Sequence, residues 1–293
     1  MRPRPLSADL VWPKCTLGCP LLDKVLRGGL ASNSITELVG EAAAAKTQTC
    51  LQLLLCAQKP ASEGGLAGSA LYIYTEGDPP LRRLQELANY QKPSSCPANN
   101  PFDHIYIERD ITSGEELLAC LERVRRLLSS PPGRPLRLIV IDSIAYIFRD
   151  VGDNASVGAY VERTGLLFQI ASLLRRYADE YNVAVVVTNQ VMDAVSAAES
   201  GGKAPAARHT GGLKLMSDGR QVIPALGLAW ANCVHTRIFL ARAQQMVVLP
   251  DDAVQQAHIL RTMQVVFSPY LPQSLCHYLV TQAGVISPEN LGR

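Results

Sequence analysis

Hydrophobic residues gather in short continuous runs along the chain, and each run is followed by polar residues. SITELVG (34–40), ALYIYTE (70–76), LRLIVIDS (136–143) and AVVVTNQ (184–190) are rich in branched aliphatic or aromatic residues. Runs of this length with this composition favour strands over helices. Because they are apolar on both faces, they predict strands buried inside a parallel sheet.

The segments between these runs carry apolar residues three or four positions apart, which is the spacing of one helix face. We expect helices at about 16–27, 46–58, 80–91, 114–129 and 160–180. Beyond residue 224 the pattern predicts strands near 235–241, 258–267 and 276–286, and the last two alternate like an antiparallel hairpin. The alternation predicts an α/β fold with a central, mainly parallel sheet flanked by helices and an antiparallel hairpin near the C-terminus.

Composition limits the class of protein further. The chain has 293 residues, of which 47% are hydrophobic, enough for one large α/β domain. Residues 1–14 hold three prolines and little pattern, so we expect a flexible arm followed by one core domain, 15–293. The net charge of +2 restricts any nucleic-acid contact to a local basic patch.

The cysteines and the N-terminus indicate an intracellular compartment. Eight cysteines show no paired C-x-x-C spacing, and several lie inside apolar runs, so we interpret them as reduced, with a disulfide arrangement as the alternative. The first residues contain no apolar leader, and no run reaches 18 apolar residues. We therefore expect neither secretion nor a membrane span, and a location in the cytosol or nucleus.

The strand that ends at Gly40 leads into GEAAAAKT, which departs from the phosphate-loop pattern G-x-x-x-x-G-K-[ST] only at Ala45. In such a loop backbone N–H groups surround a phosphate, the lysine reaches the β/γ oxygens and the hydroxyl binds Mg²⁺. The predicted nucleotide contacts are Gly40, Glu41, Ala42, Ala43, Ala44, Ala45, Lys46, Thr47 and Gln48. Alanine in place of the second glycine costs about 1–3 kcal/mol. The alternative is an alanine-rich turn from strand to helix without a ligand.

Three more strands end in polar residues that suit the same site. They end at Thr75-Glu76, Asp142-Ser143 and Asn189-Gln190. Each taken alone is compatible with a helix cap or a solvated turn. Because ligands of open α/β sheets bind at the carboxyl ends of the strands, we expect these residues to meet the phosphate loop. They would then supply a magnesium holder with Thr47, a water-activating carboxylate and a γ-phosphate sensor.

Several segments, in order along the chain, resemble the core of RecA/RadA-type recombinases from about residue 15 to 286. They are TLGCPLLDKVLRGGL, LYIYTEGDPPLRRL, LIVIDSIAYIFR, YADEYNVAVVVTNQV and LGLAWANCVHTRIFLAR. Within that family the sequences of these segments are most similar to those of the eukaryotic recombinase paralogues. The resemblance implies a RecA-like P-loop core that binds ATP and Mg²⁺.

The resemblance also assigns roles to single positions. It implies that Glu76 activates the attacking water, that Asp142 is the Walker B aspartate, and that Gln190 couples the γ-phosphate to the second DNA loop. It further implies that Arg83 stacks on adenine; without the family, Arg83 is equally well explained as a solvated helix residue.

Two loops fall where the family has its DNA-binding loops, 149–158 and 192–223. The second is long, rich in glycine and alanine, and mildly basic, which suits backbone contact with single strands. We expect a mobile loop there; the alternative is an ordinary disordered insertion. The predicted DNA-binding residues are Lys203, Arg208, Lys214 and Arg220.

The chain departs from the family pattern at several points. Ala45 is one departure. In addition, Asn232 stands where recombinases carry a histidine facing the nucleotide, and Phe267 stands where they carry an aspartate of the ATP cap. The first DNA loop has only Arg149 as a cation. We also expect no N-terminal helical domain and no Phe-x-x-Ala segment for filament assembly. These departures indicate an accessory subunit rather than a strand exchanger.

The sequence therefore predicts an ATP- and DNA-binding recombinase paralogue in homologous-recombination repair of double-strand breaks, located in the nucleus, with the cytoplasm as the alternative. Its expected partners are a second paralogue, the main strand-exchange recombinase, and single-stranded or branched DNA. A DNA-stimulated ATPase with slow hydrolysis is the alternative, so enzymatic activity stays open. A P-loop small-molecule kinase is a third hypothesis, which the T-N-Q strand end disfavours.

Overall fold

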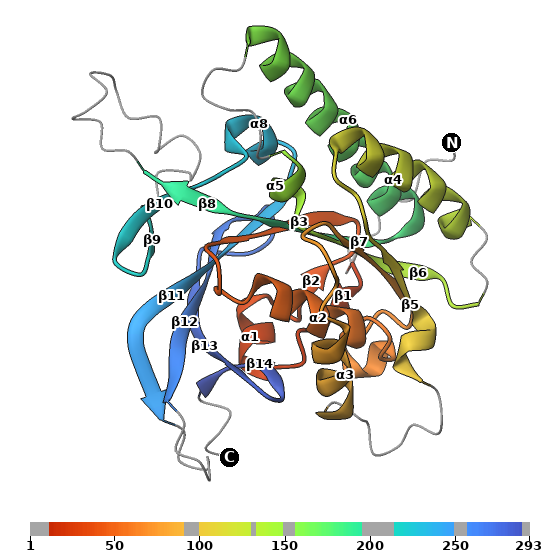
Figure 1. The fold of residues 1–293 in the computed structure, drawn as a ribbon. Coiled ribbons are helices and arrows are strands. Elements are labelled where there is room, and N and C mark those ends of the chain that lie inside the picture. The colour runs from red at the N-terminus through yellow and green to blue at the C-terminus, as the bar shows by residue number, and fades with distance from the viewer. Residues whose placement is uncertain are drawn as a thin grey trace, which may run out of the picture.

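A computed structural model of the chain describes residues 12–90, 100–129, 133–148, 156–194, 214–248 and 257–288. Within these ranges the centre of the molecule is a nine-stranded sheet with the strand order β14-β13-β12-β11-β3-β7-β6-β4-β5 (Figure 1). Its strands are β3 (Ser34–Gly40), β4 (Ser69–Tyr74), β5 (Ile105–Glu108), β6 (Leu136–Asp142), β7 (Ala184–Asn189), β11 (Thr236–Val248), β12 (Ala257–Phe267), β13 (Leu275–Thr281) and β14 (Gly284–Ile286).

The sheet confirms the predicted fold class. The strands from β11 to β5 in this order pair in parallel, and β11, β12, β13 and β14 pair antiparallel in turn. The single strand expected over 276–286 is in fact two strands, because the chain turns between Thr281 and Gly284, where Gly284 has a φ of 120°. The parallel part brings the carboxyl ends of β3, β4, β6 and β7 to one edge.

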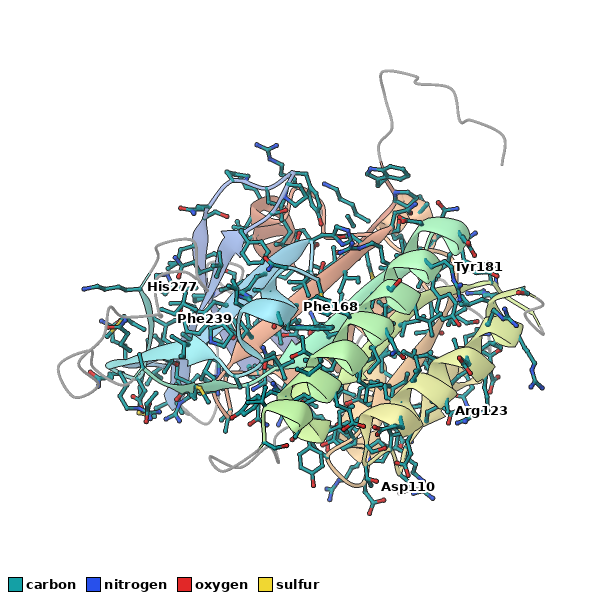
Figure 2. All side chains as sticks on the ribbon, turned by 90° about the horizontal axis from the view of Figure 1, so that it is seen from above. Asp110, Arg123, Phe168, Tyr181, Phe239 and His277 are labelled. Atoms are coloured by element: carbon teal, nitrogen blue, oxygen red, sulfur yellow. The ribbon has the colours of Figure 1, made fainter. Side chains whose placement is uncertain are left out.

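Helices cover both faces of the sheet. They are α1 (Pro20–Val25), α2 (Lys46–Cys56), α3 (Leu81–Tyr90), α4 (Gly114–Ser129), α5 (Ile144–Ile147), α6 (Val157–Tyr181) and α8 (Gly227–Ala231), with 3-10 turns η1 (Ala61–Glu63) and η2 (Pro101–His104). One core joins α1, α2 and α3 to one face, and a second joins α4, α6 and α8 to the other. Figure 2 shows α4, with Arg123, beside α6, with Phe168 and Tyr181.

The alternation of side chains along each strand separates these two cores. In β7 the side chain of Val186 packs with α2, whereas those of Val185 and Val187 pack with α4 and α6. All three are buried, which explains the continuous apolar run in the sequence. The sheet is thus a rigid base for residues at its carboxyl edge.

Two segments that the sequence left without regular structure contain strands. The ends of the predicted loop 192–223 form a three-stranded sheet of β8 (Val191–Asp193), β10 (Arg220–Pro224) and β9 (Leu215–Ser217). At the N-terminus, β1 (Lys14–Cys15) pairs with β2 (Leu30–Ala31), so Lys14 belongs to the fold rather than to the arm.

The boundaries of helices α1 and α6 differ from the prediction. Helix α1 begins at Pro20, four residues after the expected start, and ends at Val25, two residues before the expected end. Helix α6 begins at Val157, three residues before the expected start, because Ser156 caps it by accepting a hydrogen bond from the N–H of Ala159. Residues 149–155 of the predicted first DNA loop lie outside the described ranges. None of the described helices is long and apolar enough to cross a lipid bilayer.

Candidate nucleotide-binding site

The carboxyl ends of β3, β4, β6 and β7 surround a cavity of about 710 Å³. Most of the residues predicted to bind nucleotide or metal line it: Ala42, Ala43, Ala45, Lys46, Thr47, Gln48, Glu76, Arg83, Asp142 and Gln190. Gly40, Glu41 and Ala44 do not. The structure therefore brings together the four polar strand ends that the sequence singled out.

The phosphate-loop candidate runs from the end of β3 to the start of α2. Gly40 is required because a Cβ there would lie 2.2 Å from the carbonyl oxygen of Leu240 on β11. Ala45 is the N-cap of α2 and has left-handed backbone angles, φ 71° and ψ 25°. A left-handed conformation costs a residue with a Cβ about 1–2 kcal/mol. Glycine at position 45 would thus be favoured by the backbone conformation.

Lys46 lines the cavity. Its Nζ donates hydrogen bonds to the carbonyl oxygens of Gly40 (2.8 Å) and Glu41 (2.9 Å). Burial lowers the pKa of Lys46, and the nearby carboxylates of Asp142 and Glu76 act in the opposite direction. The ammonium group thus lies between the loop and two carboxylates, where an anionic ligand would meet it.

Asp142, at the end of β6, is a buried carboxylate with 2% of its surface exposed. The hydroxyl of Thr188 donates to Oδ1 at 2.6 Å and that of Tyr72 donates to Oδ2 at 3.1 Å. Burial raises the pKa of Asp142, and the hydrogen bonds from Thr188, Thr47 and Tyr72 oppose that shift. Carboxylate and hydroxyl oxygens are the ligands that Mg²⁺ prefers, so Asp142 and Thr47 fit this ion.

Tyr72 and Thr188 were missed by the sequence reading. Both lie on strands that flank β6, and their hydroxyls fix the orientation of the Asp142 side chain. The sequence does contain a signal for them, because each places a hydroxyl group within an otherwise apolar run that predicts a buried strand.

Glu76 and Gln190 join the ends of β4 and β7. The Nε2 group of Gln190 donates a hydrogen bond to Oε1 of Glu76 at 3.1 Å. The residue predicted to activate water and the residue predicted to sense the γ-phosphate therefore contact each other directly.

Arg83 closes the cavity on the side of α3. Its guanidinium donates to Oε1 of Gln48 (2.9 Å) and to the carbonyl oxygens of Thr281 (2.6 Å) and Gln282 (3.2 Å). It also forms an ion pair with Glu86 at 3.1 Å. These contacts explain why the Arg83 side chain is only 19% exposed. Arg83 is thus fixed in the lining of the cavity, and its stacking on adenine stays a prediction.

The C-terminal strands supply a wall that the sequence reading did not assign. His258 and Arg261 on β12, and residues 280–282 at the end of β13, line the cavity. Nothing local in the sequence marks them, because their position depends on the pairing of β11 with β3.

A buried polar network lies below the strand ends. Glu37 on β3 and Arg237 on β11 are fully buried and form an ion pair, in which Arg237 Nε donates to Oε2 of Glu37. The Nδ2 group of Asn189 donates to the other Glu37 oxygen at 2.7 Å. The guanidinium of Arg237 also stacks against the ring of Phe267, with its Cζ 5.2 Å from the ring centre. This network connects β3, β7 and β11 through buried side chains.

Glu41 faces away from the cavity toward the small sheet. Its carboxylate accepts hydrogen bonds from the hydroxyl of Ser217 (2.6 Å) and from Nη2 of Arg220 (3.0 Å). Arg220 also pairs with Asp193 at 2.9 Å. The charge of this predicted DNA-binding arginine is therefore matched by two carboxylates.

The other predicted DNA-binding residues are placed only in part. Lys214 precedes β9 and is exposed, and so it remains available to a polyanion. Lys203 and Arg208 lie outside the described residues.

Comparison with known proteins identifies the family. The model of the Rad51 family matches residues 11–223. The chain belongs to the Rad51 family. It is 39% identical over 286 residues to the "DNA repair protein XRCC3 homolog" of Arabidopsis thaliana, covering 93% of this chain and 92% of that protein. It is 36% identical to "DNA repair protein XRCC3" of Bos taurus, covering 93% of this chain and 74% of that protein.

The chain is also similar to a relative with a different name. The chain is 31% identical over 227 residues to "DNA repair protein RAD51 homolog 2" of Homo sapiens, covering 75% of this chain and 58% of that protein. The recombinase-paralogue resemblance inferred from the motifs is confirmed, and the small-molecule kinase hypothesis is discarded. In this member of the Rad51 family, the fold accommodates Ala45 in a left-handed turn.

Proposed function

We propose that this chain is an accessory Rad51 paralogue in the recombinational repair of DNA double-strand breaks, and that it binds ATP with Mg²⁺. The observation that carries the proposal is the convergence of the loop, Lys46 and buried Asp142 on one cavity of a Rad51-family fold. The DNA-repair names of its relatives support the same role.

Different residues of the cavity would bind different parts of Mg-ATP. Backbone N–H groups of 42–48 and the ammonium of Lys46 would bind the phosphates, and the guanidinium of Arg83 would face the base. Thr47 and Asp142 would hold Mg²⁺, which, when bound, neutralises phosphate charge. Glu76, which accepts a hydrogen bond from Gln190, would accept a proton from water.

The accessory role rests on the strained loop. Ala45 places a methyl group and an unfavourable backbone conformation where the motif has glycine. We infer that nucleotide binding orders an interface with a second paralogue and the main recombinase more than it drives turnover. A protein with this task acts in the nucleus, where the broken DNA is.

An ATPase and binding assay separates this proposal from the DNA-stimulated ATPase alternative. The native chain, Lys46→Ala and Glu76→Gln would be assayed for Mg-ATP affinity and for hydrolysis with and without single-stranded DNA. The accessory role predicts binding that Lys46→Ala abolishes and a negligible rate in every sample. The alternative predicts a native rate, raised by DNA, that Glu76→Gln removes. Lys24→Ala, at an exposed lysine of α1, is the matched control.

DNA binding is proposed through the second loop and is tested by salt dependence. Replacing a cation that contacts a phosphate should lower the slope of log affinity against log salt by about 0.7 for single strands. The residues to neutralise are Lys203, Arg208, Lys214 and Arg220. We expect the smallest effect at Arg220 because Glu41 and Asp193 already pair with it. An unchanged slope in the fourfold variant would remove the loop from the proposed interface.

Partners are tested by co-purification of the tagged full chain from cells with damaged DNA. The proposal predicts recovery of a second Rad51 paralogue and of the main recombinase. Recovery of the chain alone, at native expression, would contradict an accessory role within a complex.

A further inference from the structure

Two side chains of the C-terminal strands hold the phosphate loop from outside. Arg261 on β12 and Tyr278 on β13 are directly opposite each other in the antiparallel pair. The Nε group of Arg261 donates a hydrogen bond to the carbonyl oxygen of Ala43 at 3.0 Å. The hydroxyl of Tyr278 donates to the carbonyl oxygen of Ala44 at 2.5 Å. These are the two carbonyl groups immediately before Ala45.

The two carbonyl groups would have other partners if α2 were longer. Alanine has the highest helix propensity, and residues 42–45 are all alanine. If α2 extended through them, the carbonyls of Ala43 and Ala44 would accept the N–H groups of Thr47 and Gln48, four residues on. Instead α2 begins at Lys46, after the left-handed Ala45. The side-chain donors occupy the acceptors that a longer helix would need.

We propose that Arg261 and Tyr278 are positioning residues of the nucleotide site, which keep the alanine-rich loop open and thereby replace the conformational freedom of the missing glycine. The inference rests on the proposed nucleotide-binding function. Because the C=O and N–H of a trans peptide point in opposite directions, fixing the Ala44 carbonyl also fixes the direction of the Ala45 N–H. A loop held in this way keeps its N–H groups available to a phosphate.

The surroundings of both donors suit this task. Tyr278 is fully buried, and burial raises the pKa of its hydroxyl well above the usual range, so the group remains a donor. Nη1 of Arg261 donates to the carbonyl oxygen of Ile259 on its own strand at 2.9 Å, which leaves Nε aimed at the loop. Within the described ranges no ion pair holds Arg261, so the loop carbonyl and its own strand fix its orientation.

A double-mutant cycle between Tyr278→Phe and Ala45→Gly tests the proposal. The phenylalanine removes only the hydroxyl, and Mg-ATP affinity is measured by calorimetry. Leaving a buried carbonyl without its donor disfavours the open loop, so we expect affinity to fall on the order of tenfold in the native background. With glycine at position 45 the same change should cost less than about twofold, because the turn no longer needs the support.

The control is a second buried tyrosine. The hydroxyl of Tyr177 donates to the carbonyl oxygen of Leu121 at 2.8 Å, in the core on the other face of the sheet. Tyr177→Phe should lower the melting temperature to a similar extent and leave Mg-ATP affinity unchanged. Arg261→Lys keeps the charge and loses the guanidinium geometry, so it should also weaken binding, and glycine at 45 should again rescue it.

Amide hydrogen exchange without nucleotide makes the test independent of the proposed function. If the loop relaxes toward helix in Tyr278→Phe, the N–H groups of Thr47 and Gln48 should exchange more slowly than in the native chain. Equal loss of affinity in both backgrounds, or no loss in either, overturns the inference. If the native chain binds no Mg-ATP, the proposed function fails; slower exchange then still supports the inference, and unchanged exchange overturns it.

Discussion

Ala45→Gly has two effects of different size, which the structure separates. The left-handed backbone of Ala45, φ 71° and ψ 25°, costs about 1–2 kcal/mol that glycine would recover. Glycine loses about 0.4–1 kcal/mol through the greater freedom of the unfolded chain. It also removes a buried methyl group, since Ala45 is 7% exposed, at about 0.8 kcal/mol. These terms nearly cancel, so the melting temperature should move by less than about 4 °C.

Affinity for Mg-ATP should change more than stability does. The backbone strain is present without nucleotide, so its relief does not by itself strengthen binding. Ala45, however, is one of the residues that line the cavity, where the motif brings backbone N–H groups against phosphate. A recovered hydrogen bond to a charged group is worth about 1.5–3 kcal/mol, which is roughly ten- to a hundredfold in the dissociation constant.

Calorimetric titration and thermal unfolding of the same samples measure both quantities. Ala67→Gly is the matched control, because Ala67 also has a positive φ of 50° but lies in a turn before β4, outside the cavity wall. Its substitution should leave Mg-ATP affinity unchanged. An unchanged dissociation constant in Ala45→Gly, or a loss of several kcal/mol in its unfolding free energy, would refute the reasoning about this position.

Three further changes test the surroundings of the site. Arg237→Met leaves the Glu37 carboxylate buried without its cation, so urea unfolding should show a loss of about 3–5 kcal/mol, and a loss below 1 kcal/mol would contradict the network. Burial, and next the charge of Arg175, lower the pKa of His235, and its neutral Nδ1 accepts a hydrogen bond from the N–H of Ile35. The contribution of neutral His235 to the unfolding free energy is therefore present above pH 6.5 and is lost as the pH falls through the folded-state pKa. His235→Asn should therefore flatten the pH dependence of the unfolding free energy between about pH 5 and 7. Asp142→Asn relieves a buried charge and should raise the melting temperature at pH 7 while it abolishes Mg-ATP binding; a lower melting temperature would show that the carboxylate stabilises the fold.

The strand ends of the site were predictable because the sequence states them locally. A buried parallel strand is apolar on both faces, so the first polar residue after the run marks its carboxyl end. Glu76, Asp142 and Gln190 all follow such runs, and the α/β order places these ends at one edge. Their functional roles stay predictions.

The C-terminal wall of the cavity was not predictable in the same way. Arg261 reaches a carbonyl that is 218 positions away in the chain, and Glu41 reaches Arg220 across 179 positions. No periodicity encodes contacts of this kind, since they follow from the pairing of β3 with β11 and β12 beyond it. The basic residues of the second loop can be read from the sequence, but the ion pairs of Arg220 with Glu41 and Asp193 depend on the three-dimensional structure.

The loop itself shows tertiary structure overriding local propensity. Four consecutive alanines favour helix. In the structure Ala43 and Ala45 both have positive φ, and α2 starts only at Lys46. The competing contacts come from side chains of distant strands, which helix propensity does not include.

Glu41 connects the loop after β3 to the small sheet. Its backbone belongs to the loop between β3 and α2, and its oxygens accept hydrogen bonds from the hydroxyl of Ser217 and the guanidinium of Arg220 on the small sheet. A ligand that moves either the loop or the small sheet would have to break the hydrogen bonds that Ser217 and Arg220 donate to Glu41. If the chain binds both nucleotide and DNA as proposed, thermodynamic reciprocity requires that each changes the affinity for the other by an equal factor.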